Sequence, residues 1–442
     1  MNKNSVLSGY VAAVLLVFTM MVLVSCVGAD TMRREESLRG EEDVSEEGLK
    51  KPGNNYPVIL VYGFMGFDSY SFVRWLYWGG AVDLEKELTE LGYTVYTAKI
   101  GPVSSNHDRA CELYAAIKGG RVDYGEQHSR NAGHSRYGRS YEGLYPQWGT
   151  EDPETGEVRK VHLVGHSMGG QTSRVLVHLL EHGIEEEEVE SDSPSPLFAG
   201  DKNWVSSVTT FSTPHNGATI VFQYRDAGFI RRLYTKWLAT TSVRMEDPFI
   251  DMQLEHWEVA KREDETFPEF LRRAVDEELW KDIEDFSYYD LSPKGSEELN
   301  GRMPASPHVY YFSWATSCTV MDPETGYHVP AKGMNLPLHS NARFLGSFED
   351  LPDGVDGPAS KWWENDGIVN TWSMDGPKIG SRDVIREFDG EPVRGVWNFM
   401  GTLHPYDHWQ IHVVPPLVRT PPPGYDSLLE LYKSLCEMLW SL

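Results

Sequence analysis

The fold is decided by the stretch Val161-His162-Leu163-Val164-Gly165-His166-Ser167-Met168-Gly169, which a helix-like run over residues 171–180 follows. Its last five residues have the pattern G-x-S-x-G. Between a strand and a helix, this pattern places the serine on a sharp turn at the top of a sheet. Glycines are needed there because the turn brings two backbones too close for side chains. A Gly/Ser-rich turn of an ordinary α/β protein is the alternative, and the flanking strand and helix patterns argue against it.

On either side of this stretch, other apolar runs have the pattern of β-strands. Residues 57–62 form a continuous apolar run, typical of a parallel strand that is buried on both faces. Further strand candidates lie over 93–100, 160–164, 204–211 and 309–314, with helical patterns between several of them, for example over 83–91. Strands that alternate with helices predict an α/β fold with a mostly parallel sheet flanked by helices.

Two segments are too long to be simple connections, so they predict insertions. Residues 101–150 are rich in Gly, His, Arg and Tyr, and residues 217–300 are charged with a helical pattern. The acidic run over 185–188 predicts a solvated loop. Leucines at helical spacing over 427–440 predict a packed closing helix. We predict one domain over 55–442, preceded by a charged flexible linker over 30–54.

The first residues have the pattern of an export signal. Residues 6–27 are almost continuously apolar, and Val27-Gly28-Ala29 is a small-residue cleavage site. We predict a cleaved signal peptide over 1–29 and a secreted protein. The run is also long enough for an uncleaved membrane anchor. Leu23-Val24-Ser25-Cys26 resembles a bacterial lipoprotein box, which would lipidate Cys26.

Composition restricts the class of protein and of partner. The chain has 442 residues, 12% of them aromatic, which argues against extensive disorder. Its net charge of −26 argues against a nucleic-acid partner, because a polyanion would be repelled. Beyond Cys26, only Cys111, Cys318 and Cys436 remain, too few for a disulfide framework. Their disulfide state is open, and no obligate protein partner is evident.

A nucleophilic Ser167 needs a histidine base and an acid to orient it. On this kind of sheet the acid and then the histidine follow the serine along the chain. Asp366 lies in the turn sequence Glu364-Asn365-Asp366-Gly367, which precedes an apolar pair. On sequence order alone the rival acids are Asp353, Asp356 and Asp375, and the candidate bases are His404, His408 and His412. His408 lies in a Pro-containing loop, where mobility and exposure suit catalysis.

The tetrahedral intermediate of acyl transfer also needs two backbone N–H donors. One is expected from Met168, directly after the nucleophile. The other is expected from the loop after the first strand, Gly63-Phe64-Met65-Gly66, with Phe64 as the donor.

A candidate zinc site lies in the insertions. His128 and His134 are six residues apart, with Asp108 upstream and Glu255 in the second insertion. Two imidazoles and two carboxylates close a four-coordinate zinc site with no open position, which predicts a structural role. Spacing alone does not single out this set, because the chain has 15 histidines.

Many short motifs, in the same order, match one family. They include Tyr77-Trp78-Gly79-Gly80, Gly101-Pro102-Val103-Ser104-Ser105-Asn106, Asp108-Arg109-Ala110-Cys111-Glu112, Val122-Asp123-Tyr124-Gly125, Gly133-His134, Gly138-Arg139, Gly169-Gly170-Gln171-Thr172, Thr213-Pro214-His215-Asn216-Gly217, Gly333-Met334-Asn335, Glu364-Asn365-Asp366-Gly367-Ile368-Val369-Asn370-Thr371 and Gly395-Val396-Trp397-Asn398. With them the chain resembles the zinc-containing thermoalkalophilic lipases of Gram-positive bacilli (bacterial lipase family I.5), which have relatives in plants.

The resemblance implies an α/β-hydrolase fold with a zinc-binding insertion and a helical lid insertion. By it Ser167, Asp366 and His408 fall on the catalytic triad, and Phe64 and Met168 fall on the oxyanion donors. Asp108, His128 and His134 fall on three zinc ligands, and Glu255 stands where the family carries aspartate. The lid maps after Gly217, with the apolar residues Ile220, Val221, Phe222, Phe229, Ile230, Leu233, Trp237 and Leu238; plain packing against the core is the alternative for them.

The chain also departs from the family pattern. The family's calcium carboxylates are replaced by Gln410 and Pro415, so we predict no calcium there. Tyr62 replaces a histidine before the first oxyanion loop, and Met168 replaces a glutamine. The lid segment is shorter and differs in sequence, which leaves the acyl-chain preference open.

Together these features predict an exported serine ester hydrolase, a triacylglycerol lipase that acts through an acyl-enzyme on lipid esters at an oil–water interface. The alternatives are an acyltransferase, a short-chain carboxylesterase and a catalytically inactive lipid-binding protein.

Overall fold

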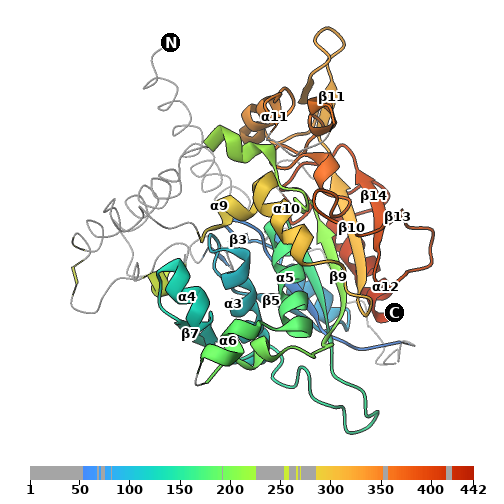
Figure 1. Cartoon of the computed structure of the whole chain (residues 1–442). Coiled ribbons are helices and arrows are strands. Elements are labelled where there is room, and N and C mark those ends of the chain that lie inside the picture. Colours follow the sequence, from blue (N-terminus) through green and yellow to red (C-terminus); the bar gives the residue numbers. More distant parts are fainter. Residues whose placement is uncertain are drawn as a thin grey trace.

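The computed structural model describes residues 53–66, 69–70, 75–80, 82–191, 193–224, 253–257, 265–266, 269, 285–351, 357–414 and 421–442. Its centre is a seven-stranded sheet with the order β13-β14-β10-β9-β8-β1-β5 (Figure 1). Every neighbouring pair in this sheet is parallel. The strands are β1 (Val58–Val61), β5 (Val95–Ala98), β8 (Val161–His166), β9 (Val205–Phe211), β10 (Tyr310–Thr316), β13 (Ile385–Glu387) and β14 (Trp397–Leu403).

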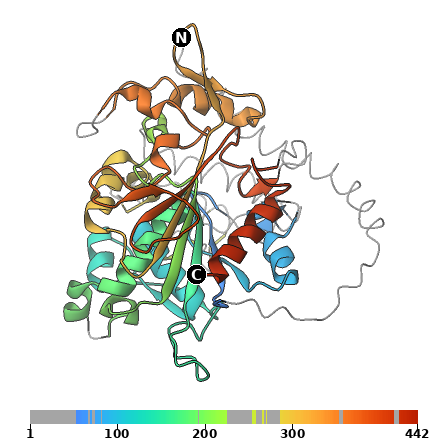
Figure 2. The same ribbon diagram turned by 90° about the vertical axis from the view of Figure 1, so that its right-hand side faces the viewer.

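Helices cover both faces of this sheet. Figure 2 shows α12 beside α2 on one face and the group around α3 and α5 on the other. The helices are α2 (Leu84–Glu90), α3 (Asn106–Lys118), α4 (Glu126–Ala132), α5 (Met168–His182), α6 (Glu185–Glu190), α9 (Ser287–Asp290), α10 (Pro293–Arg302), α11 (His339–Leu345) and α12 (Leu428–Trp440). The predicted α/β architecture and the closing helix are therefore confirmed.

Burial explains why these runs form the inner strands. All residues of β1, β8 and β9 are buried, as expected for a parallel sheet covered on both faces. β9 nevertheless has the sequence VSSVTTF, so its hydroxyls need partners inside the protein. Ser207 Oγ lies 2.7 Å from His162 Nδ1, and Thr210 Oγ1 lies 3.1 Å from His215 Nε2.

The described part of the chain also contains three smaller sheets. They are formed by β2 (Ser69–Tyr70), β3 (Trp75–Leu76), β4 (Gly79–Gly80) and β15 (Val413–Val414); by β6 (Gly120–Asp123) with β7 (Tyr137–Tyr141); and by β11 (Thr319–Met321) with β12 (His328–Pro330). The β6–β7 pair and α4 lie within the predicted insertion over 101–150.

The parallel arrangement brings distant loops to one edge of the sheet. The loops after β1, β8, β9, β10 and β14 all leave from the carboxyl ends of neighbouring strands. In parallel α/β sheets this edge is where ligands bind. The candidate nucleophile and both candidate oxyanion donors follow β8 and β1 there.

Several predictions concern residues outside the described ranges. The signal peptide over 1–29, Cys26 and nearly all of the linker precede residue 53, so they stay predictions. No helix in the described ranges is long and apolar enough to cross a membrane. Cys111, Cys318 and Cys436 are all buried, and no disulfide joins any two of them.

Candidate active site and metal centre

The predicted elbow lies between β8 and α5. Ser167 has φ 55° and ψ −129°, a backbone conformation that is strained for a residue with a side chain. A Cβ atom added at Gly165 would lie 2.4 Å from the backbone nitrogen of Gly170, and one at Gly169 would lie 2.2 Å from the Val61 carbonyl oxygen. Both glycines are therefore required by close backbone approach. The Ser167 N–H donates to the Phe211 carbonyl at 2.8 Å, which ties the elbow to β9.

Asp366 is fully buried, and its carboxylate accepts four hydrogen bonds. Oδ1 accepts from the backbone N–H groups of Ile368 at 3.0 Å and Val369 at 2.8 Å. Oδ2 accepts from Thr316 Oγ1 at 2.7 Å and lies 2.8 Å from His408 Nδ1. These donors suit an ionised carboxylate, which has only acceptor sites.

His408 lies next to the elbow. Its Nδ1 faces Asp366, its backbone N–H donates to the Asp366 carbonyl at 3.0 Å, and its own carbonyl lies 3.0 Å from His166 Nε2. The rings of His408 and His166 are 4.6 Å apart. Ser167 and His408 both lie in the described part of the chain, and no hydrogen bond joins Ser167 Oγ to His408 Nε2. Catalytic hydrogen bonds of this kind are often long without substrate and shorten when the substrate binds.

The rival acids and bases are placed differently. His404 Nδ1 lies 3.3 Å from Ser317 Oγ, and His412 Nδ1 lies 2.9 Å from the Tyr77 carbonyl, so neither ring contacts a carboxylate in the described residues. Asp375 pairs with Lys378 at 2.6 Å. Asp353 and Asp356 lie outside the described residues.

The loop after β1 lies against the nucleophile. A Cβ atom at Gly63 would be 2.7 Å from Ser167 Cβ, so the backbone before Phe64 touches the elbow. Met168 is the first residue of α5, where N–H groups have no partner within the helix. Among the described residues, neither the Phe64 nor the Met168 N–H donates to a protein acceptor. Both are available to a developing oxyanion.

Two buried side chains support this loop, and no local sequence pattern predicts this role for either of them. The Tyr62 hydroxyl donates to the Ile100 carbonyl at 2.6 Å and accepts from the Ile100 N–H at 2.9 Å. The guanidinium of Arg109 is fully buried and bonds Thr172 Oγ1 and the carbonyls of Gly101 and Tyr62. Arg109 thus ties the loop after β1 to α5.

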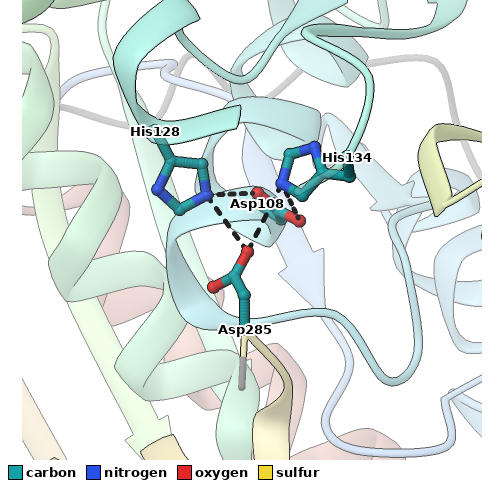
Figure 3. A group of neighbouring side chains, drawn as sticks. All are labelled: Asp108, His128, His134 and Asp285. Atoms are coloured by element: carbon teal, nitrogen blue, oxygen red, sulfur yellow. Dashed lines mark hydrogen bonds and ion pairs between the residues drawn. The ribbon is translucent and has the colours of Figure 1, made fainter. Parts of the chain in front are cut away.

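Four side chains converge at a candidate metal centre (Figure 3). They are Asp108 on α3, His128 on α4, His134 after α4, and Asp285 just before α9, with one ligand atom from each within 4.8 Å of the others. His128 Nε2 lies 3.1 Å from both Asp108 Oδ1 and Asp285 Oδ2. His134 Nε2 lies 3.7 Å from Asp108 Oδ2 and 3.5 Å from Asp285 Oδ2.

These spacings fit a tetrahedral zinc ion. Zinc bonds of 2.0–2.1 Å to nitrogen and oxygen separate the ligand atoms by roughly 3.3 Å. His134 Nε2 is buried and has no hydrogen-bond partner among the described residues, which is unfavourable unless it binds something. Two imidazoles and two carboxylates fill a closed set, so a metal here would have a structural role.

The prediction of Glu255 as the fourth ligand is wrong for this cluster. Glu255 lies in a short 3₁₀ helix, Glu255–Trp257, whose buried residues are His256 and Trp257. Its side chain is 42% exposed and pairs with Arg139 instead. The fourth position is taken by Asp285, whose neighbour Phe286 forms a β-bridge with Ser104, just before α3. Sequence spacing carries no signal for this long-range contact.

Hydrogen bonds within the cluster shift the pKa values of Asp108 and His128. Burial alone would raise the pKa of Asp108, but hydrogen bonds with His128 and His256 hold it well below its usual range. Burial would lower the pKa of His128, yet its hydrogen bonds with Asp108 and Asp285 raise it to about 10. Zinc would therefore displace a proton from His128 when it binds.

One acidic residue of the predicted solvated loop is in fact buried. The segment forms α6, and the carboxylate of Glu187 accepts from the backbone N–H groups of Gln127 at 3.0 Å and His128 at 2.6 Å. Glu187 thus caps the first turn of α4 and holds the segment that carries His128. Free N–H groups at a helix start make this position favourable for a carboxylate.

The lid and calcium predictions are only partly within the described residues. Ile220, Val221 and Phe222 lie in a 3₁₀ helix, Thr219–Tyr224, and the Phe222 ring stacks on Phe348 at 5.3 Å. The other lid residues named above, Phe229, Ile230, Leu233, Trp237 and Leu238, lie outside the described ranges, as does Pro415. Gln410 is buried and accepts from the Asp407 N–H at 2.7 Å.

A family model described as "Lipase-like, C-terminal domain" matches residues 54–420. The chain belongs to this lipase family. A lipase of Staphylococcus epidermidis is 35% identical over 385 residues, which are 85% of this chain and 53% of that protein. A Staphylococcus hyicus lipase is 32% identical over 366 residues, covering 81% and 54%. The chain thus spans about half the length of these curated relatives.

Solved structures confirm the α/β-hydrolase-type lipase fold. EstA from Clostridium botulinum has a TM-score of 0.77 and 39% identity, covering 88% of each chain. Lipase 1 from Pelosinus fermentans has a TM-score of 0.74 and 41% identity, covering 88% of this chain and 99% of its own. The Staphylococcus hyicus lipase has a TM-score of 0.74 and 30% identity, covering 88% and 95%.

Proposed function

We propose that this member of the lipase family is a serine ester hydrolase, a triacylglycerol lipase. The observation that carries the proposal is the buried Asp366–His408 pair, joined at 2.8 Å beside the strained Ser167 elbow. A carboxylate, an imidazole and a hydroxyl in this order form the arrangement that activates a serine. The relatives that are named lipases support the substrate class.

In the proposed mechanism Ser167 attacks the ester carbonyl while His408 takes its proton. Asp366, held by two backbone N–H groups and the Thr316 hydroxyl, orients the His408 ring and stabilises its charged form. The N–H groups of Phe64 and Met168 bind the oxyanion. His408 then protonates the leaving alcohol and activates the water that releases the fatty acid.

We also propose a structural zinc ion held by Asp108, His128, His134 and Asp285, with no calcium at the Gln410 position. This set supports the finer assignment to the zinc-containing thermoalkalophilic lipases. When bound, zinc would cross-link α3, the segment around α4 and the chain before α9. We further propose export by a signal peptide over 1–29 and a lid after Gly217 that opens at an oil–water interface.

The experiment compares the wild type with Ser167→Ala and with Ser173→Ala as a matched control. Ser173 is also a buried serine of this region, but among the described residues its hydroxyl bonds only the Gly169 carbonyl of its own helix. We expect Ser167→Ala to lose about 10⁵-fold in turnover of p-nitrophenyl esters and emulsified triacylglycerols, and Ser173→Ala to stay near wild type.

Near-normal turnover of Ser167→Ala, or a wild type that hydrolyses no ester, would refute the proposal. A competing alcohol in the same assay separates hydrolysis from acyl transfer. Transfer of the acyl group mainly to that alcohol rather than to water would make the protein an acyltransferase.

A further inference from the structure

One buried hydroxyl connects two parts of the proposed active site. Tyr77 lies in the turn between β3 and β4 and is only 5% exposed. Its hydroxyl oxygen accepts from the backbone N–H of Gly63 at 3.0 Å. Gly63 immediately precedes Phe64, a proposed oxyanion donor. The same hydroxyl lies 2.5 Å from Nδ1 of His166, the residue before Ser167.

The hydrogen bonds define which atom of each group carries the proton. The Gly63 N–H donates to the Tyr77 oxygen, and the Tyr77 hydroxyl donates to His166 Nδ1, because the His408 carbonyl can only accept from Nε2. The proton of a neutral His166 is thereby placed on Nε2, which donates to the His408 carbonyl at 3.0 Å. Burial lowers the pKa of His166 well below its ordinary value, in agreement with a neutral ring.

The ring of Tyr77 makes a second connection to the same region. It stacks on His412 with 4.0 Å between ring centroids and 13° between planes. His412 Nδ1 lies 2.9 Å from the Tyr77 carbonyl, and the Gly79 N–H donates to the His412 carbonyl. The segment that carries Tyr77 is therefore fastened to the chain that follows His408.

We propose that Tyr77 is a positioning residue that holds the oxyanion loop and the backbone of His408 in register with Ser167, through Gly63 on one side and His166 on the other. This inference rests on the proposed function, because it concerns the same site. Because Tyr77 is only 5% exposed, we assign it no contact with the substrate. Its effect is geometric, since catalysis depends on the placement of the reacting groups to within about 1 Å.

The test is Tyr77→Phe, which removes the hydroxyl and keeps the ring, with Tyr311→Phe as the matched control. Tyr311 is 2% exposed, and its hydroxyl accepts from the Ser306 N–H at 3.0 Å, near the amino end of β10 and outside the proposed site. Both variants lose one buried hydroxyl that accepts a backbone N–H. Tyr77→Phe also loses the bond with His166 Nδ1, so its thermal stability should fall at least as far as that of Tyr311→Phe.

On a soluble p-nitrophenyl ester we expect kcat of Tyr77→Phe to fall about 10- to 100-fold, with KM within about twofold of wild type. Tyr311→Phe should keep both constants. Fluorophosphonate titration of Ser167 counts the folded sites, so kcat refers to folded enzyme only. A kcat for Tyr77→Phe within twofold of Tyr311→Phe overturns the inference, as does a change confined to KM.

If Tyr77→Phe does not fold, His166→Leu provides the second test. It removes the link to His408 and leaves the bond between Gly63 and Tyr77. We expect at least about a 10-fold lower kcat with KM unchanged, and a kcat within twofold of wild type overturns the inference. Failure of the proposed function is distinct, because then the wild type itself is inactive or Ser167→Ala stays active.

Discussion

Replacement of Asp285 by asparagine tests the metal centre most directly. Asp285 Oδ2 lies 3.1 Å from His128 Nε2 and 3.5 Å from His134 Nε2, where it faces both imidazoles. Asparagine keeps the size of the side chain but removes its charge. Glu255→Gln is the matched control, because it removes the same charge from an exposed side chain that pairs with Arg139.

The magnitude follows from ligand loss. Mutation of a residue that only supports a ligand weakens metal binding about 10- to 100-fold, so loss of a direct ligand should weaken it by at least about 100-fold. A factor of 100 corresponds to about 2.7 kcal/mol of zinc-linked stability at a fixed free zinc concentration. A domain of roughly 390 residues has an unfolding entropy of about 0.8 kcal/mol/K, so the melting temperature with zinc should fall by about 3 °C.

Zinc affinity is measured by competition with a chromogenic chelator, and melting is followed with zinc and with excess chelator. The zinc-dependent part of the melting shift should shrink in Asp285→Asn and persist in Glu255→Gln. An unchanged affinity in Asp285→Asn, or an equal loss in Glu255→Gln, would refute the assignment of Asp285. A wild type that contains no zinc and melts at the same temperature with chelator would refute the metal centre itself.

Two further predictions concern stability. Gly169→Ala should lower the free energy of unfolding, measured by urea denaturation, by about 3 kcal/mol or more, because its Cβ would lie 2.2 Å from the Val61 carbonyl oxygen. Gly301→Ala is the control, since its Cβ would have its nearest neighbour at 3.6 Å. It should change the free energy of unfolding by less than about 1 kcal/mol. Burial lowers the pKa of His162 to about 3, so the unfolded chain binds a proton that the folded state excludes, and stability should fall as pH drops below about 6.5. His162→Gln should reduce the slope of the free energy of unfolding against pH by about 1.4 kcal/mol per pH unit between pH 6 and 4.5. An unchanged slope would contradict the lowered pKa of His162.

The strands and helices that the sequence predicted are those with strong local patterns. The apolar run over 57–62 became β1, and the helical run over 171–180 lies within α5. β13 and β14 were missed. β14 has the sequence WNFMGTL, with a glycine, polar residues and a register shift against β10, so it lacks a regular strand pattern. Its place in the sheet depends on pairing rather than on local preference.

In the candidate site, too, local patterns predicted some features and only tertiary contacts decided others. The elbow could be predicted because a strand, two obligatory glycines and a helix are contiguous in the chain. Sequence order left three histidines and four acids open, and the family resemblance chose among them. Only the fold placed His408 against Asp366 while His404 and His412 contact other groups.

The sequence by itself determined the α/β architecture and the turn at Ser167, because short-range periodicity and backbone sterics are properties of neighbouring residues. The family resemblance supplied three members of the candidate metal cluster. Tertiary structure alone decided that Asp285 rather than Glu255 completes the cluster, that Glu187 caps α4, and that Tyr77 joins the loop after β1 to the elbow. The contacts of Asp285 with His128, of Glu187 with His128 and of Tyr77 with His166 each join residues 59 or more positions apart. They form only when the sheet brings such segments together, and no local pattern specifies that meeting.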